Sequence, residues 1–156
     1  MISIDKKAPA FKLFDQNGKL ISLKDYLCKN VILYFYPKDD TSGCTAEACS
    51  FRDDFSLFKN VDAVILGVSP DSIASHKKFQ QKYSLPFTLL SDESKEVVEK
   101  YGVWKEKSMY GRKYMGVERT TIIIDKKGVV RKIYPKVKVA GHNEEVLTAL
   151  DGLADD

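Results

Sequence analysis

The stretch NVILYFYPKDDTSGCTAEACSF, residues 30–51, decides the fold of this 156-residue chain. Its first part, NVILYFYP, is apolar or aromatic on both faces, which is typical of a strand buried in the centre of a sheet and ending at Pro37. Beyond the polar turn, apolar side chains recur at spacings of three and four, which predicts an amphipathic helix over residues 45–58. The sequence therefore predicts a central strand that leads directly into a helix.

The rest of the chain continues this alternation of strands and helices. Strands are predicted over residues 61–70, 86–92, 119–125 and 129–134, and helices over residues 71–83, over residues 95–102 with Gly102 as the C-terminal cap, and from Asn143, which would cap the last helix. The turn Asp125-Lys126-Lys127-Gly128 joins the last two strands, so we expect them to pair antiparallel.

An N-terminal β-hairpin completes the expected architecture. Asn17-Gly18 lies between two alternating apolar stretches, which is the signal of a two-residue hairpin turn over residues 11–23. The order of elements predicts an α/β fold with a mixed central sheet flanked by helices. With 156 residues and 44% hydrophobic side chains, we expect one domain over residues 1–156.

Charge and hydropathy exclude several classes of function. The 25 Lys and Arg against 22 Asp and Glu are interleaved and leave a net charge of only +3, so nucleic-acid binding is not expected. The sequence has neither a long apolar run nor an apolar leader after its start, so we expect no membrane span and a cytoplasmic location. The basic stretch at residues 105–119 is interpreted as a solvated loop, with docking of a partner protein as the alternative.

Cys44 is placed where a cysteine becomes reactive. It follows the central strand and falls in the first turn of the next helix, where unpaired N–H groups and the helix dipole favour a thiolate. A helix terminus supplies only about 0.3–2 kcal/mol, so a nearby cation is also required. Nearly full ionisation at pH 7 would raise the thiolate fraction of this cysteine only about 30-fold. Enzymes usually accelerate reactions by about 10⁶-fold or more, so a catalyst must also stabilise a transition state.

Four residues then give a resemblance to a family. Pro37, Thr41 and Cys44 form a P-x-x-x-T-x-x-C loop, and Arg119 opens a later strand, so the chain resembles the peroxiredoxins, which are thiol peroxidases with a thioredoxin-like fold. The resemblance implies that Cys44 attacks the peroxide and forms a sulfenic acid, that the Thr41 hydroxyl binds the peroxide, that Pro37 shields the loop and that Arg119 supplies the cation. It implies no cofactor and no metal.

Two more residues extend the resemblance. Glu47 matches an acidic position that would orient the arginine or the loop. Cys49, with the stretches YGVW and KVKVAGHNEEVL, is most similar to the Q-type, or bacterioferritin comigratory protein, subfamily. That resemblance implies that Cys49 resolves the sulfenic acid as an intramolecular disulfide, that a thioredoxin-like partner reduces it, that hydrogen peroxide and organic hydroperoxides are substrates, and that the protein is a monomer.

A disulfide between Cys44 and Cys49 is incompatible with a regular helix. Five residues along a regular helix separate Cα atoms by about 8.6 Å, whereas a disulfide requires less than about 7 Å. If Cys44 and Cys49 pair, then the first turns of the helix must unwind.

Other interpretations of these side chains stay open. Cys44, Cys49, His76 and His142 could bind zinc, but the sequence has no C-x-x-C pair, which a thioredoxin-type disulfide reductase would also require. A pure binding protein or holdase is a third class, which would not consume peroxide. Both histidines are interpreted as surface or helix-entry residues, and Cys28 as structural or incidental. The preferred peroxide and the physiological reductant are not fixed by the sequence.

Overall fold

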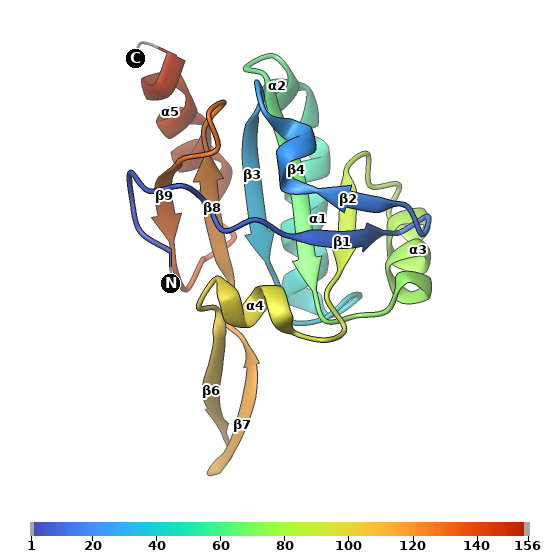
Figure 1. Cartoon of the computed structure of the whole chain (residues 1–156). Coiled ribbons are helices and arrows are strands. Elements are labelled where there is room, and N and C mark those ends of the chain that lie inside the picture. The colour runs from blue at the N-terminus through green and yellow to red at the C-terminus, as the bar shows by residue number, and fades with distance from the viewer. Residues whose placement is uncertain (1, 155–156) are drawn as a thin grey trace.

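A computed structural model describes residues 2–154 as a mixed sheet packed between helices (Figure 1). The seven strands follow the order β2-β1-β5-β4-β3-β8-β9. Their bounds are β1 (Lys12–Asp15), β2 (Leu20–Ser22), β3 (Asn30–Phe35), β4 (Ala63–Ser69), β5 (Thr88–Ser91), β8 (Thr120–Ile124) and β9 (Val130–Tyr134). β3 pairs parallel with β4 and antiparallel with β8, and β1 pairs antiparallel with β2. The predicted α/β architecture, with a mixed sheet and an N-terminal hairpin, is confirmed.

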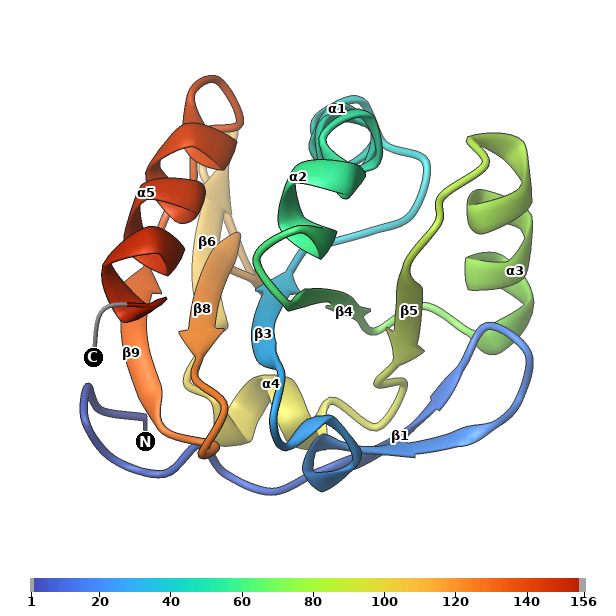
Figure 2. The same cartoon turned by 90° about the horizontal axis from the view of Figure 1, so that it is seen from above.

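The sheet separates two apolar cores, one on each face. The helices α1 (Ser42–Asp53), α2 (Phe55–Lys59), α3 (Ile73–Lys82) and α5 (His142–Ala154) cover one face, and α4 (Glu96–Lys100) and the 3₁₀ helix η1 (Leu23–Tyr26) lie on the other (Figure 2). Along β3, Leu33 and Phe35 belong to the core on the α4 side, whereas Ile32 and Tyr34 belong to the core under α1. Because side chains alternate along a strand, a strand buried on both faces is expected to be apolar at nearly every position, as β3 is from Val31 to Phe35.

The helix predicted over residues 45–58 is two helices. α1 begins earlier, at Ser42, and α2 follows after a break at Asp54, where φ is −101° and ψ is 11°. Asn143, predicted to cap its own helix, lies inside the first turn of α5, and its amide donates instead to the Ser50 carbonyl (3.0 Å) and to Asp54 Oδ2 (2.9 Å). The end of α1 is therefore tied to the start of α5.

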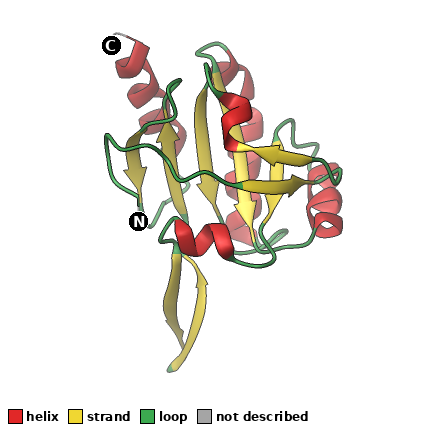
Figure 3. Ribbon diagram, viewed as in Figure 1, coloured by secondary structure: helices red, strands yellow, loops and turns green. Residues whose placement is uncertain are grey.

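The basic stretch predicted to be a solvated loop is a second hairpin. β6 (Trp104–Met109) and β7 (Arg112–Val117) pair antiparallel and project from the body of the molecule (Figure 3). Tyr110 and Gly111 turn the chain with positive φ values of 52° and 76°, as two-residue hairpin turns require. Most side chains of both strands are exposed, so no alternation of apolar and polar residues marked them in the sequence. Within residues 2–154, no helix is long and apolar enough to cross a membrane.

Candidate active site

Cys44 lies in the first turn of α1, as predicted. The helix follows β3 after a short loop, with Thr41 in extended backbone conformation as its N-cap residue. The Cys44 side chain is almost fully buried, at 2% exposure, in the core under α1, and it is a free thiol. Its sulfur is therefore shielded from bulk solvent while it lies where the helix dipole favours an anion.

Arg119 supplies the cation that is required in addition to the helix terminus. It comes from the connection between β7 and β8, 75 residues further along the chain, and its Nη2 donates to Cys44 Sγ at 3.2 Å. A Cβ atom at Gly43 would lie 3.1 Å from this Nη2, so the glycine allows the guanidinium to lie close against the first turn of α1. The structure thus brings together the cysteine and arginine that the sequence analysis singled out.

Glu47 holds the other side of the guanidinium. Arg119 Nη1 donates to Glu47 Oε1 at 2.6 Å, and Glu47 is only 2% exposed. Burial raises the pKa of Glu47 to about 7, against the opposing effect of Arg119. Its second oxygen, Oε2, is buried with no hydrogen-bond partner within residues 2–154, which explains why pairing does not outweigh burial. The carboxyl is therefore near its midpoint at neutral pH.

The pKa of Arg119 shifts in the direction that keeps it charged. Burial lowers the pKa of this guanidinium, but the neighbouring Glu47 and Cys44 outweigh burial and raise it above its ordinary value. One permanent cation thus faces two groups that can each carry a negative charge. A thiolate at Cys44 and a carboxylate at Glu47 compete for that single charge.

Thr41 presents its hydroxyl in a defined direction. Its side chain is exposed, and Oγ1 donates its proton to the Lys38 carbonyl at 2.9 Å. The lone pairs of this oxygen are then the part of the hydroxyl that can receive a hydrogen bond from a bound molecule. Pro37, which is half-buried, lies at the other end of the same loop.

The other two cysteines differ in their surroundings. Cys49 is half-buried on α1, which is helical without interruption from Ser42 to Asp53, so Cys44 and Cys49 lie on one continuous helix. Cys28 is exposed in the turn before β3, with a positive φ of 77°. The geometric conflict predicted for a bond between Cys44 and Cys49 therefore applies to this folded state.

The interpretation of both histidines as surface residues is wrong because both are buried, whereas helix entry is confirmed for His142, the first residue of α5. His76 is 0% exposed and contacts Asp39, and His142 is 2% exposed between Thr121 Oγ1 (2.8 Å) and Glu145 Oε1 (2.6 Å). In the sequence, His76 stood at helical spacing from Phe79, which marked a position on the buried face of α3, but its polar partners come from distant segments. Sequence reasoning missed Asp39 and Asp71 altogether.

The four residues of the zinc alternative do not form a cluster. Among the described residues, one group of three could offer ligand atoms that all lie within 4.8 Å of one another. It consists of Asp39, Asp71 and His76. Cys44 and Cys49 are not part of it.

Comparisons with known proteins point to one family. The model of the AhpC/TSA family matches residues 4–133. A putative peroxiredoxin Bcp from Coxiella burnetii is 53% identical over 149 residues, which cover 96% of this chain and 99% of that protein. Peroxiredoxin Bcp from Bacillus subtilis is 48% identical over 154 residues, 99% of this chain and 98% of its own length.

Solved structures show the same relationship. A peroxiredoxin Q mutant from Xylella fastidiosa superposes with a TM-score of 0.93 at 34% identity, covering 99% of this chain and 98% of that one. The bacterioferritin comigratory protein of Xanthomonas campestris, described for its alkyl peroxide reduction activity, superposes with a TM-score of 0.87 at 39% identity and covers 92% of each chain.

Proposed function

From the premise that this chain belongs to the AhpC/TSA family, as a peroxiredoxin of the Bcp, or Q-type, group, we propose that Cys44 is its peroxidatic nucleophile. The protein is a thiol peroxidase with a thioredoxin-like fold. The observation that carries the proposal is the 3.2 Å contact from Arg119 Nη2 to Cys44 Sγ in the first turn of α1. A buried sulfur with a fixed cation and a helix N-terminus is arranged to react as a thiolate.

In the first step, the Cys44 thiolate donates an electron pair to the terminal oxygen of a hydroperoxide. The O–O bond breaks, the sulfur becomes a sulfenic acid, and the leaving alkoxide or hydroxide takes up a proton to give an alcohol or water. Arg119 stabilises the negative charge as it moves from sulfur to oxygen, and the Thr41 oxygen accepts a hydrogen bond from the peroxide. Pro37 shields the loop, and Glu47 holds the guanidinium in place.

In the second step, Cys49 resolves the sulfenic acid. Its thiol attacks the Cys44 sulfur, a disulfide forms, and the sulfenic oxygen leaves as water. Because both residues lie on the uninterrupted helix α1, the first turns must unwind before the sulfurs can bond. A thioredoxin-like dithiol then reduces the disulfide and is itself oxidised.

For the substrate we propose hydrogen peroxide and organic hydroperoxides. The alkyl peroxide reduction described for the Xanthomonas campestris relative supports the organic class. We also propose that residues 1–156 form one domain that acts in the cytoplasm as a monomer.

The proposal is tested by intact mass and thiol count after one equivalent of peroxide. The reduced protein should lose two of its three thiols, and peptide mapping should find Cys44 bonded to Cys49. The Cys28→Ser variant, a matched control at an exposed cysteine, should behave like the wild type, whereas Cys44→Ser should not consume peroxide. A bond from Cys44 to Cys28, or normal turnover of Cys49→Ser with thioredoxin, would show that the resolving residue is assigned wrongly.

A further inference from the structure

A single peptide group lies between the Thr41 hydroxyl and a carboxylate outside the active-site loop. The carbonyl oxygen of the Lys38–Asp39 peptide accepts the Thr41 Oγ1 proton at 2.9 Å. The N–H of the same peptide donates to Asp71 Oδ2 at 2.8 Å. Because a peptide group is planar and rigid, fixing its N–H also fixes the direction of its carbonyl.

Asp71 is itself held in place from the sheet. Its Oδ2 accepts the Ser69 hydroxyl at 2.6 Å, and its carbonyl accepts the Ser91 hydroxyl at 2.6 Å. Ser69 ends β4 and Ser91 ends β5, so Asp71 is anchored to two neighbouring strands, through its carboxylate to the first and through its backbone carbonyl to the second.

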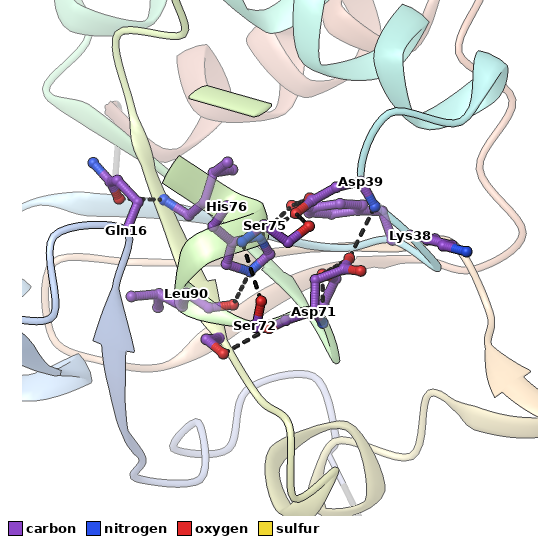
Figure 4. A network of polar contacts seen from close by, with 12 residues as sticks. Gln16, Lys38, Asp39, Asp71, Ser72, Ser75, His76 and Leu90 are labelled. Carbon is purple, nitrogen blue, oxygen red and sulfur yellow. Dashed lines mark hydrogen bonds and ion pairs between the residues drawn. The ribbon is translucent and has the colours of Figure 1, made fainter. Parts of the chain in front are cut away.

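The Asp39 side chain provides a second anchor for the same peptide. Its carboxylate is buried and accepts from Tyr36 (2.6 Å) and Ser75 (2.8 Å), while His76 Nδ1 lies 2.7 Å from Oδ2 (Figure 4). His76 Nε2 donates to the Leu90 carbonyl at 2.9 Å, so Nε2 carries a hydrogen, since a carbonyl only accepts. Nδ1 therefore faces the carboxylate and can share a hydrogen bond with Oδ2. The loop is thus bound to α3 and β5.

We propose that Asp71, together with Asp39 and His76, is a positioning residue for peroxide binding at Thr41. By fixing the Lys38–Asp39 peptide, the network holds the Thr41 proton on the Lys38 carbonyl and leaves the oxygen lone pairs to accept a hydrogen bond from the peroxide. The inference rests on the proposed function. Because Cys44 is held separately by Arg119, the network should affect the reaction with peroxide and leave the reactivity of the thiolate unchanged.

The experiment compares two rates in a background of Cys28→Ser and Cys49→Ser, which leaves Cys44 as the only thiol. One rate is sulfenic acid formation with hydrogen peroxide, and the other is alkylation by iodoacetamide, which requires the thiolate but not Thr41. Asp71→Ala should slow the peroxide reaction about 3- to 10-fold, the worth of one hydrogen bond, with alkylation within about 2-fold of the parent. Asp71→Asn keeps a carbonyl oxygen for the Asp39 N–H and should restore the peroxide rate.

A second matched pair tests the histidine. In His76→Asn the amide nitrogen replaces Nδ1 and can still donate to Asp39, whereas in His76→Gln it replaces Nε2 and can donate only to Leu90. His76→Gln should therefore lose more of the peroxide rate than His76→Asn. A variant that merely misfolds would lose alkylation as well as the peroxide reaction. A peroxide rate that is lower in His76→Gln than in His76→Asn, with alkylation unchanged in both, therefore cannot be explained by misfolding. If Asp71→Ala does not fold, Ser69→Ala removes one of the anchors of the carboxylate and should act in the same direction.

A double-mutant cycle decides whether Asp71 acts through Thr41. In a Thr41→Val background, Asp71→Ala should cause no further loss, because the hydroxyl that it orients is gone. Additive losses, or equal losses in peroxide reaction and alkylation, would overturn the inference and leave the proposed function intact. A parent that alkylates but does not react with peroxide would refute the proposed function, and the inference with it.

Discussion

Glu47 is the residue whose protonation couples the stability of the protein to its active site. Burial raises the pKa of this carboxyl to about 7, from an ordinary value of 4.5. Because the folded state binds the proton more tightly than the unfolded state, this contribution to stability is fully present below about pH 4.5 and is lost as the pH rises to about 7. At 1.36 kcal/mol per pKa unit, the loss is about 3 kcal/mol.

Glu47→Gln, which imitates the protonated carboxyl, should remove this pH dependence. We expect the variant to be more stable than the wild type at pH 8 and nearly equal to it at pH 4.5, as measured by urea unfolding across that range. The control is Glu144→Gln, at an exposed carboxyl of α5, which should follow the wild type. Parallel pH curves for wild type and Glu47→Gln would contradict the assignment.

Arg119 should do more than ionise Cys44. Its Nη2 donates directly to the sulfur, so it can also stabilise the charge that moves to oxygen in the transition state. If its role were ionisation alone, Arg119→Met would lose at most about 30-fold, and raising the pH to 9 would restore the peroxide rate. We expect a larger loss that remains at pH 9, measured as the second-order rate constant at both pH values. Full recovery at pH 9 would limit Arg119 to an electrostatic role in ionisation.

At the scale of the element, α1 should unwind between two fixed points. Asp39, just before the helix, is bound to α3 through His76, and Ser50, near its end, is bound to α5 through Asn143. We therefore expect oxidation to raise amide exchange between Asp40 and Cys49, with protection retained at Tyr36 and at Phe51. Cys49→Ser, which cannot form the bond, is the control for peroxide treatment.

The far limit of that segment can be moved by mutation. Asn143→Ala removes the contacts with Ser50 and Asp54, so exchange in the oxidised protein should extend toward Asp53. Exchange that is unchanged throughout α1 on oxidation would rule out the unwinding.

The sequence predicted the elements whose burial or turn leaves a local pattern of residues. β3 and β4 carry nearly continuous apolar runs because both faces of each strand are covered, and the N-terminal hairpin carried its turn signal at Asn17-Gly18. The β6–β7 hairpin escaped because its side chains are exposed on both faces, and the break at Asp54 because the apolar spacing continues across it. Local sequence patterns reflect which side chains are buried. The β6–β7 hairpin buries too few side chains to produce such a pattern, and the break at Asp54 does not interrupt one.

The candidate site was predictable only in part, for a related reason. Cys44 was placed at a helix start by local sequence, but its pairing with Arg119 came from a resemblance, since 75 residues separate the two. The buried role of His76 depends on Asp39 and Leu90, which lie 37 and 14 residues away in the chain. Partners that the fold brings together from distant segments leave no spacing in the sequence.

At the scale of the whole molecule, the sheet should confine the proposed unwinding of α1 to one of the two cores. Cys44 and Ala48 belong to the core under α1, whereas Ile122 belongs to the core on the α4 side. Oxidation should therefore weaken the first core and leave the second intact. A substitution should cost stability in the oxidised protein only where its surroundings are still folded.

Ala48→Gly and Ile122→Val test this division, because both residues are 0% exposed. In the reduced protein, Ala48→Gly should cost about 0.5–1 kcal/mol, as glycine does inside a helix, and Ile122→Val about 0.5–1.5 kcal/mol. In the oxidised protein, the cost of Ala48→Gly should fall nearly to zero, since residue 48 is then outside a helix, while that of Ile122→Val stays the same. Urea unfolding of each variant against the wild type in the same redox state cancels the effect of the disulfide on the unfolded chain. Equal costs of Ala48→Gly in both redox states would mean that α1 remains helical between its cysteines, and Cys49 could then not be the resolving residue.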